Sequence, residues 1–201
     1  MGNGKAMKLE TDGIEYDILE RCIEKVTAIP GCFLEIGTRK GGSMQIIIDA
    51  AIRSCQKRDF VSVDPYGNIP YNNGQAVTRY DYTNEMKCAA LSDLYRYALQ
   101  SRVNLVTFTM TDALFFKWTK AGIPIYDQEC RMEQNVAFAF LDGPHDVESI
   151  SEELYELARR TYAGAMVVID NIDLFEPEKL NTNGFWKEIE RNNQKIAYVK
   201  L

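Results

Sequence analysis

Five short apolar runs of the strand type alternate with helical segments along this 201-residue chain, and the alternation constrains the fold more than any other feature. Strands that are buried on both faces appear as continuous apolar runs, and strands that alternate with helices pair in parallel. The sequence therefore predicts an α/β protein with a mostly parallel twisted sheet and helices on both faces. The five runs are residues 32–37, 60–64, 103–109, 136–141 and 165–169.

The other segments complete a single Rossmann-like domain that spans residues 1–201. Residues 1–30 hold an amphipathic leading helix, which the apolar spacing predicts from Asp12 to Ile29. Residues 68–82 are rich in Asn, Tyr and turn residues, so we expect a loop or lid there. Hydrophobic spacing predicts one more helix and then a closing strand near the end of the chain, at residues 184–192 and 195–201.

Composition limits the partners. The formal charge is −6, whereas nucleic-acid binding depends on Lys and Arg that neutralise phosphates, so no nucleic-acid partner is expected. No apolar run reaches the ~18 residues of a membrane span, and residues 1–10 lack the apolar stretch of a secretory signal. We expect a cytoplasmic protein that acts on small molecules, with five scattered cysteines as buried free thiols. The sequence leaves open whether the chain forms a homo-oligomer.

A glycine-rich turn from Glu35 to Ser43 joins the first strand to its helix. Glycines such as Gly37 and Gly41 let backbone amides approach a ligand, and a helix N-terminus favours a carboxylate, so a nucleotide-like ligand is expected here. The nicotinamide fingerprint is not met, because Arg39 stands where its second glycine would be. A tight turn that binds nothing is the alternative.

Acidic residues follow the second and third strands. Asp64 is placed to accept hydrogen bonds from both hydroxyls of a ribose, although Asp before Pro65 is also ordinary turn chemistry. Asp112 is placed to accept from the exocyclic amine of an adenine. Thr111 and Asp112 are equally suited to capping the next helix.

The ends of the fourth and fifth strands carry hard oxygen ligands. Asp142 ends one strand and Asp170 with Asn171 ends the next, and two carboxylates with an amide oxygen suit Mg²⁺. The alternative is that these residues only form strand-end turns. His145, the single histidine of the chain, follows three residues after Asp142. It is a candidate general base, or else a cap for the helix that begins near Asp146.

Together these segments resemble the class I, S-adenosylmethionine-dependent and metal-dependent O-methyltransferases, from about Cys32 to Asn171. Catechol-type enzymes have the same Asp, Asp, Asn trio, and macrolide-sugar O-methyltransferases have an Asp-Gly-x-His run like residues 142–145. The resemblance implies a class I methyltransferase fold, Mg²⁺ on the trio, and S-adenosylmethionine at the glycine-rich turn. The cofactor residues that it implies are Glu35, Gly37, Thr38, Gly41 and Ser43 at the methionine end, Asp64 at the ribose, and Met110, Thr111 and Asp112 at the adenine.

Two departures separate the chain from these branches. Catechol-type enzymes have lysine where His145 stands, and the macrolide-sugar group usually has Asp-Asp where this chain has Asp170-Asn171. The predicted function is Mg²⁺-dependent O-methylation of a hydroxyl group on a small molecule or sugar. A non-catalytic binding protein of the same fold is an alternative. A further one is an NAD-dependent oxidoreductase, which the glycine spacing disfavours.

Overall fold

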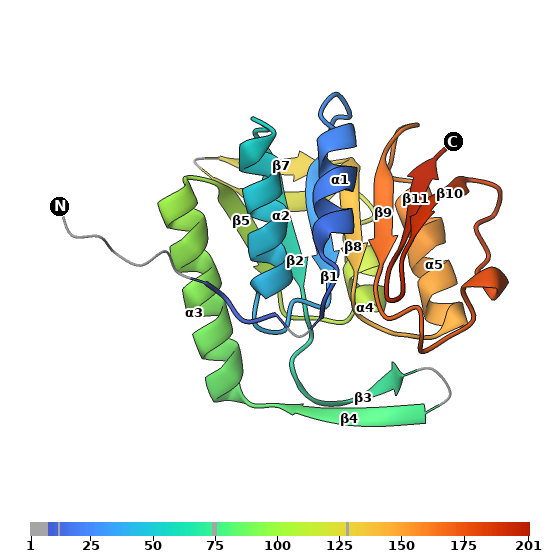
Figure 1. The fold of residues 1–201 in the computed structure, drawn as a ribbon. Coiled ribbons are helices and arrows are strands. Elements are labelled where there is room, and N and C mark those ends of the chain that lie inside the picture. Colours follow the sequence, from blue (N-terminus) through green and yellow to red (C-terminus); the bar gives the residue numbers. More distant parts are fainter. Residues whose placement is uncertain (1–7, 12, 74–75, 128) are drawn as a thin grey trace.

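The computed structural model describes residues 8–11, 13–73, 76–127 and 129–201, and it contains a seven-stranded sheet between two layers of helices (Figure 1). Neighbouring strands pair in parallel except β11, which runs antiparallel to both of its neighbours. The predicted α/β class is therefore confirmed. In spatial order the strands are β10 (Trp186–Arg191), β11 (Ile196–Lys200), β9 (Met166–Ile169), β8 (Val136–Leu141), β1 (Cys32–Ile36), β2 (Asp59–Val63) and β5 (Asn104–Phe108).

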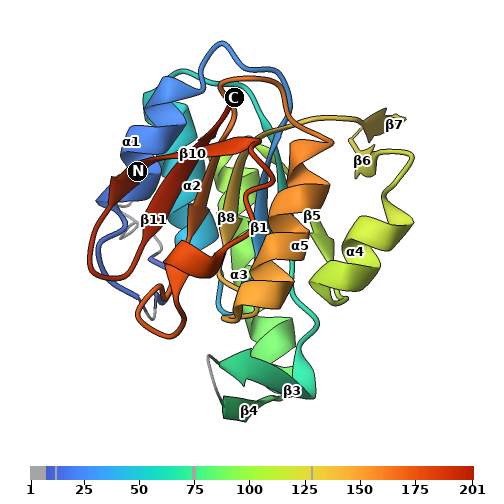
Figure 2. The ribbon, with the colours of Figure 1, turned by 90° about the vertical axis from the view of Figure 1, so that its right-hand side faces the viewer.

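Helices cover both faces of this sheet. Figure 2 shows α1 (Asp17–Lys25) and α2 (Gly42–Arg53) on one side and α4 (Asp112–Trp118) and α5 (Val147–Ala158) on the other. Leucine and alanine side chains of α3 (Asn84–Ser101) join the core beneath α1 and α2. Two apolar cores result, one on each side of the sheet.

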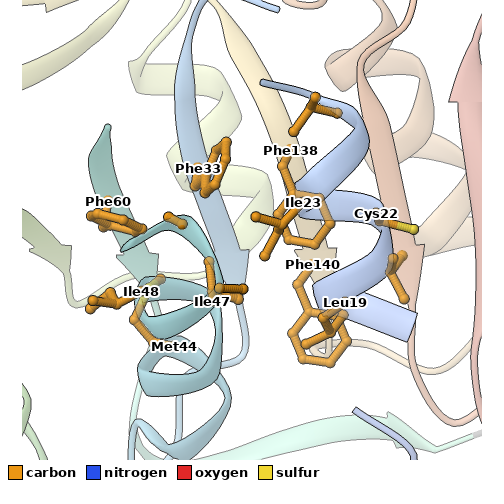
Figure 3. Close-up of a cluster of buried hydrophobic side chains, with 14 of the residues drawn as sticks. Leu19, Cys22, Ile23, Phe33, Met44, Ile47, Ile48, Phe60, Phe138 and Phe140 are labelled. Atoms are coloured by element: carbon orange, nitrogen blue, oxygen red, sulfur yellow. The ribbon is translucent and has the colours of Figure 1, made fainter. Parts of the chain in front are cut away.

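The core beneath α1 and α2 is built around phenylalanines that meet edge to face (Figure 3). The Phe33 ring of β1 makes edge contacts with Phe60 and Phe138 of the two adjacent strands, at centroid distances of 5.8 and 5.6 Å. Ile47 of α2 and Ile23 of α1 close over these rings, and all five side chains are fully buried. Burying each such side chain contributes about 1.5–3 kcal/mol, so this contact holds the central strands in place.

The first 30 residues contain a shorter helix than the apolar spacing predicts. Helix α1 covers Asp17–Lys25 rather than the whole span to Ile29, and Asp12 and residues 1–7 lie outside the described residues. Residues 8–11 have no regular secondary structure and pack against α2.

The helix predicted at residues 184–192 is wrong, because this segment contains strand β10. It pairs antiparallel with β11, from Trp186 opposite Lys200 to Arg191 opposite Ile196. The indole Nε1 of Trp186 also donates to the Leu154 carbonyl of α5 at 2.9 Å. Pairing with a neighbouring strand has overridden a weak helical periodicity.

Residues 68–82, expected to be a loop or lid, form most of an antiparallel hairpin. Its strands are β3 (Gly67–Asn73) and β4 (Ala76–Tyr82), and residues 74–75 lie outside the described ones. Figure 1 shows the hairpin beyond the lower edge of the main sheet. A second, smaller hairpin joins β6 (Ile123–Tyr126) to β7 (Cys130–Glu133), and a short 3-10 helix follows at Pro177–Lys179.

The cysteines divide by burial. Cys22 and Cys32 are buried free thiols as expected, and burial raises the pKa of the Cys22 thiol to about 12. Cys55, Cys88 and Cys130 are exposed, so the expectation of five buried thiols was wrong for these three. Among the described helices, none combines the length and the apolar character needed to cross a membrane.

Candidate functional site

The carboxyl ends of the parallel strands meet at one edge of the sheet, where a cleft of about 340 Å³ opens. Three predicted cofactor residues, Gly37, Thr111 and Asp112, line it together, as the rule for open parallel sheets requires. The hairpin, where the sequence predicted a loop or lid, contributes an apolar wall. The remaining lining residues are Ile36, Val63, Pro65, Ile69, Pro70, Val77, Gly143, Pro144 and Ser149.

Gly37 marks the closest approach of two strand ends. Its φ is +90°, and a Cβ atom at this position would lie 1.9 Å from the backbone oxygen of Asp142. The Gly37 amide donates to the Val63 carbonyl at 2.8 Å, and the Asp142 amide donates to the Ile36 carbonyl at 2.8 Å. A residue without a side chain is therefore required for β1, β2 and β8 to end together.

The rest of the glycine-rich turn packs against the chain's own N-terminal segment. Gly41, with φ +82°, is the N-cap residue of α2, and its amide donates to the Thr38 carbonyl at 2.8 Å. The buried Thr38 hydroxyl bonds the hydroxyl of Ser62. A Cβ at Gly42 would lie 2.3 Å from the backbone oxygen of Glu10, so residues 8–11 cover the first turn of α2. The predicted cofactor residues Glu35 and Ser43 are buried.

Asp64 organises the loops at the end of β2. One carboxylate oxygen accepts from the amide of Arg39 at 2.7 Å, and the other accepts from the amide of Tyr66 at 2.8 Å. The Tyr66 hydroxyl in turn donates to the Arg39 carbonyl at 2.8 Å. Burial raises the pKa of the Asp64 carboxyl, and the amide donors oppose that shift. The turn chemistry weighed in the sequence is therefore present, and it joins Asp64 to the glycine-rich turn.

Thr111 caps α4, as its sequence position allows: its hydroxyl accepts from the Leu114 amide at 3.3 Å. Asp112 is the first residue of that helix, and Met110 is half-buried against the core on this side of the sheet. Burial raises the pKa of the Asp112 carboxyl. The adenine-end residues thus lie at the start of α4, with Thr111 and Asp112 facing the cleft.

Glu153 of α5 is a buried acid that sequence reasoning missed. Its side chain is 1% exposed, and burial together with the neighbouring Asp112 and Asp146 raises its pKa well above the usual range. A signal was present, because Glu153 falls beside Ile150 and Leu154 on the buried face of the helix. The Glu153 carboxyl therefore keeps its proton at pH values where an exposed glutamate has lost it.

Glu153→Gln is expected to raise the melting temperature at neutral pH and to change it little near pH 4. Between the ordinary pKa of 4.5 and the raised one, folded Glu153 holds a proton that the unfolded chain has released. The free energy of unfolding of the wild type therefore falls as pH rises through this window, by up to about 1.4 kcal/mol per pH unit. The variant does not show this decrease, because glutamine has no carboxyl group to titrate. Thermal melts across this pH range check it. Glu152→Gln, an exposed neighbour, is the control, and equal shifts in both variants would contradict the assignment.

Asp142 and Asp170 occupy adjacent strand ends, as predicted. Strands β8 and β9 pair in parallel up to Leu141 opposite Ile169, and the Asp170 amide donates to the Leu141 carbonyl at 2.9 Å. Asn171 has φ +52°, a conformation that Asn tolerates better than most residues, and its amide donates to Asp170 Oδ1 at 2.8 Å.

Lys195 lies beside Asp170 at this edge of the sheet, a position that the sequence did not indicate. Its Nζ lies 2.9 Å from Asp170 Oδ1, donates to the Ile14 carbonyl at 2.7 Å, and sits 4.5 Å from the centroid of the Tyr16 ring. The lysine side chain is fully buried. Only the position of β11 beside β9 brings Lys195 to Asp170.

The residues therefore do not fit a resident Mg²⁺ in this arrangement. The ammonium group of Lys195 already pairs with Asp170, one of the two carboxylates that the trio would offer to the ion, and the two cations would compete for it. Within the described part of the chain, no three or more His, Cys, Asp or Glu side chains gather in a way that could hold a metal ion.

His145 lies on the loop between β8 and α5, and its side chain is half-buried. The cap of α5 is supplied by Asp146, whose carboxylate accepts from the Ser149 amide at 2.9 Å and from the Ser149 hydroxyl at 2.8 Å. The alternative role of His145 as that helix cap is therefore filled by its neighbour. What remains is a titratable side chain that follows the cleft residues Gly143 and Pro144.

A family model of known proteins matches more than half of this chain. Residues 34–172 match a family model described as a methyltransferase domain. A search of curated proteins finds no match.

Solved structures share the fold. The O-methyltransferase NovP is 17% identical, with a TM-score of 0.57 over 92% of this chain and 78% of that one. CalS11, a calicheamicin methyltransferase also described as a TDP-rhamnose 3'-O-methyltransferase, is 14% identical, with a TM-score of 0.62 over 92% and 77%. The O-methyltransferase TomG from Streptomyces achromogenes, solved with S-adenosylmethionine, is 13% identical, with a TM-score of 0.56 over 94% and 81%.

Proposed function

The chain belongs to the methyltransferase-domain family, and we propose that it transfers the methyl group of S-adenosylmethionine to a hydroxyl oxygen of a small molecule or sugar. The observation that carries the proposal is the cleft at the carboxyl edge of the sheet, where Gly37, Thr111 and Asp112 converge. Its volume, about 340 Å³, falls in the range of small-molecule sites, and its walls are mostly apolar with few polar groups.

The cofactor would lie across the ends of β1, β2 and β5. Gly37 admits the ligand close to the backbone, and the Asp112 carboxylate is placed to accept from the exocyclic amine of the adenine. Asp64 holds the loop at the ribose end through the amides of Arg39 and Tyr66. The methionine end of the cofactor would be shaped by four residues of the glycine-rich turn, Glu35, Thr38, Gly41 and Ser43. Met110 would help to shape the adenine end.

His145 is the proposed general base. The bond between the sulfonium sulfur and its methyl carbon breaks as a bond from the acceptor oxygen to that carbon forms, and the hydroxyl proton passes to the imidazole. S-adenosylhomocysteine and the methyl ether are the products. A neutral imidazole, held on the loop after β8, supplies the proton acceptor that this reaction needs.

The Mg²⁺ assigned to Asp142, Asp170 and Asn171 by the sequence is left out of this mechanism, because Lys195 already pairs with Asp170. A sugar hydroxyl as acceptor is supported by the fold shared with CalS11, described as acting on TDP-rhamnose. The cytoplasmic location and the lack of a nucleic-acid partner stay predictions of the sequence.

Isothermal titration with S-adenosylmethionine and with NAD tests the cofactor. Binding of the first and not of the second is expected, since the family is one of methyltransferases. Methylation by the S-adenosylmethionine-loaded protein of a hydroxyl acceptor, from a panel of sugar nucleotides and phenols, then separates the enzyme from a non-catalytic binding protein. Binding of NAD alone would overturn the proposal.

Asp64→Ala is expected to weaken S-adenosylmethionine binding by roughly tenfold or more, because lost hydrogen bonds to a charged group typically cost about 1.5–3 kcal/mol. The variant leaves the amides of Arg39 and Tyr66 without their acceptor, so the loop at the ribose end loosens. Asp64→Asn keeps one acceptor oxygen and should lose less. Titration calorimetry on both variants checks this, and wild-type affinity in Asp64→Ala would remove Asp64 from the site.

A further inference from the structure

We propose that Lys195 takes the place of a divalent cation at the strand edge, so that this protein binds its cofactor and transfers the methyl group without Mg²⁺. The inference rests on the proposed function, because it concerns the same methyl transfer. Its test measures metal binding, which does not depend on that function. Lys195 is a positioning residue here, because its buried ammonium contacts Asp170 and not the cleft.

Lys195 and Asp170 form a buried pair of opposite charges. A fully buried ammonium is stable only when it is paired and hydrogen-bonded, and Nζ of Lys195 has a carboxylate, a carbonyl oxygen and an aromatic face around it. These partners match an ammonium group well. The single negative charge of Asp170 is neutralised by the single positive charge of Lys195. Of the trio, only the Asp142 carboxylate would then balance a divalent ion, and one of the two charges of that ion would be uncompensated.

Hydrogen bonds of the backbone hold both partners of this pair in place. The Lys195 amide donates to Asn192 Oδ1 at 2.6 Å, and the Asn192 amide donates back to the Lys195 carbonyl at 2.9 Å. The Ile172 amide donates to the Gln194 carbonyl at 3.0 Å, which ties this turn to the end of β9. The lysine therefore starts from a fixed turn beside Asp170, and moving it aside for a metal ion would break a buried ion pair.

Without a metal ion, His145 alone accepts the proton of the acceptor hydroxyl. A metal ion lowers the proton affinity of the acceptor hydroxyl before methyl transfer. With Lys195 on Asp170, the charge at this edge is balanced inside the protein, and the base on the loop after β8 has to remove the proton. The third oxygen ligand of the predicted trio, Asn171, then serves the turn that ends β9.

Binding of Mn²⁺, a spectroscopic substitute for Mg²⁺, tests the inference directly. Wild-type protein is first saturated with S-adenosylhomocysteine, and free Mn²⁺ is followed by electron paramagnetic resonance. We expect no binding at millimolar Mn²⁺, and the same S-adenosylmethionine affinity in excess chelator as in millimolar Mg²⁺. Stoichiometric Mn²⁺ binding by the wild type would overturn the inference. Failure of the wild type to bind S-adenosylmethionine would instead overturn the proposed function.

Lys195→Met supplies the complementary result. The variant keeps an unbranched side chain that is one atom shorter, and it leaves the Asp170 carboxylate buried without its cation, so we expect a lower melting temperature that Mn²⁺ partly restores. Adding Asp170→Asn to Lys195→Met removes both charges, and this double variant should regain stability without binding Mn²⁺. Lys187→Met, an exposed lysine of β10, controls for the loss of one positive charge. A melting temperature unchanged in Lys195→Met would overturn the inference, and if this variant does not fold, the wild-type titration decides.

Discussion

Replacing His145 with alanine is expected to lower kcat by about 10²- to 10⁴-fold and to leave the affinity for S-adenosylmethionine nearly unchanged. The loss is large because the proposed mechanism has one proton acceptor. Asp146 already caps α5, so the histidine is not needed there. The wild-type rate is expected to rise with pH as the imidazole loses its proton, and the variant should lose that dependence. Single-turnover kinetics on cofactor-loaded protein, with an acceptor found in the panel, measures both.

Asp146→Ala is the matched control for this result. It removes the helix cap next to His145, which typically costs about 1 kcal/mol of stability, while leaving the imidazole in the sequence. The two variants should therefore separate: His145→Ala loses rate and keeps its melting temperature, whereas Asp146→Ala loses melting temperature and keeps most of its rate. A stable and fully active His145→Ala protein would remove the base from the mechanism.

Gly37→Ala is expected to abolish measurable cofactor binding at micromolar concentrations and to lower stability by about 2–4 kcal/mol. Forcing an atom into a packed site costs about 1–3 kcal/mol, and holding a residue with a side chain at positive φ adds about 1 kcal/mol. The new Cβ would lie 1.9 Å from the Asp142 carbonyl oxygen, so the end of β8 has to move. That movement displaces Gly143 and Pro144 in the cleft wall. Calorimetric titration and a thermal melt check both effects.

Gly184→Ala separates the clash from the backbone strain. Gly184 also has positive φ, at +70°, but a Cβ there would meet nothing within 4 Å. This control should lose only the smaller, conformational part of the stability and bind the cofactor as the wild type does. If Gly37→Ala matched Gly184→Ala in both measurements, the close approach of the strand ends would not shape the cleft.

Local patterns in the sequence were sufficient to predict the central strands of the sheet and the residues at the edge where these strands end. The apolar runs around Phe33, Phe138 and Val167 are long enough and buried enough to be strands in any α/β arrangement, and all three lie in the parallel part of the sheet. Because the carboxyl ends of parallel strands meet at one edge of a sheet, the sequence placed Gly37, Asp142 and Asp170 around one crevice, and the structure brings these strand ends together.

Tertiary structure decided the features that depend on distant partners. Segment 184–192 became a strand because β11 offered its backbone for pairing, and the loop at 68–82 became a hairpin that forms one wall of the cleft. The proton on Glu153 depends on burial beside Asp112, which belongs to another helix. Lys195 reaches Asp170 only because β11 inserts antiparallel next to β9. Residue types and spacing show which side chains are available for chemistry, but the charge that each one faces is set by packing between segments far apart in the chain.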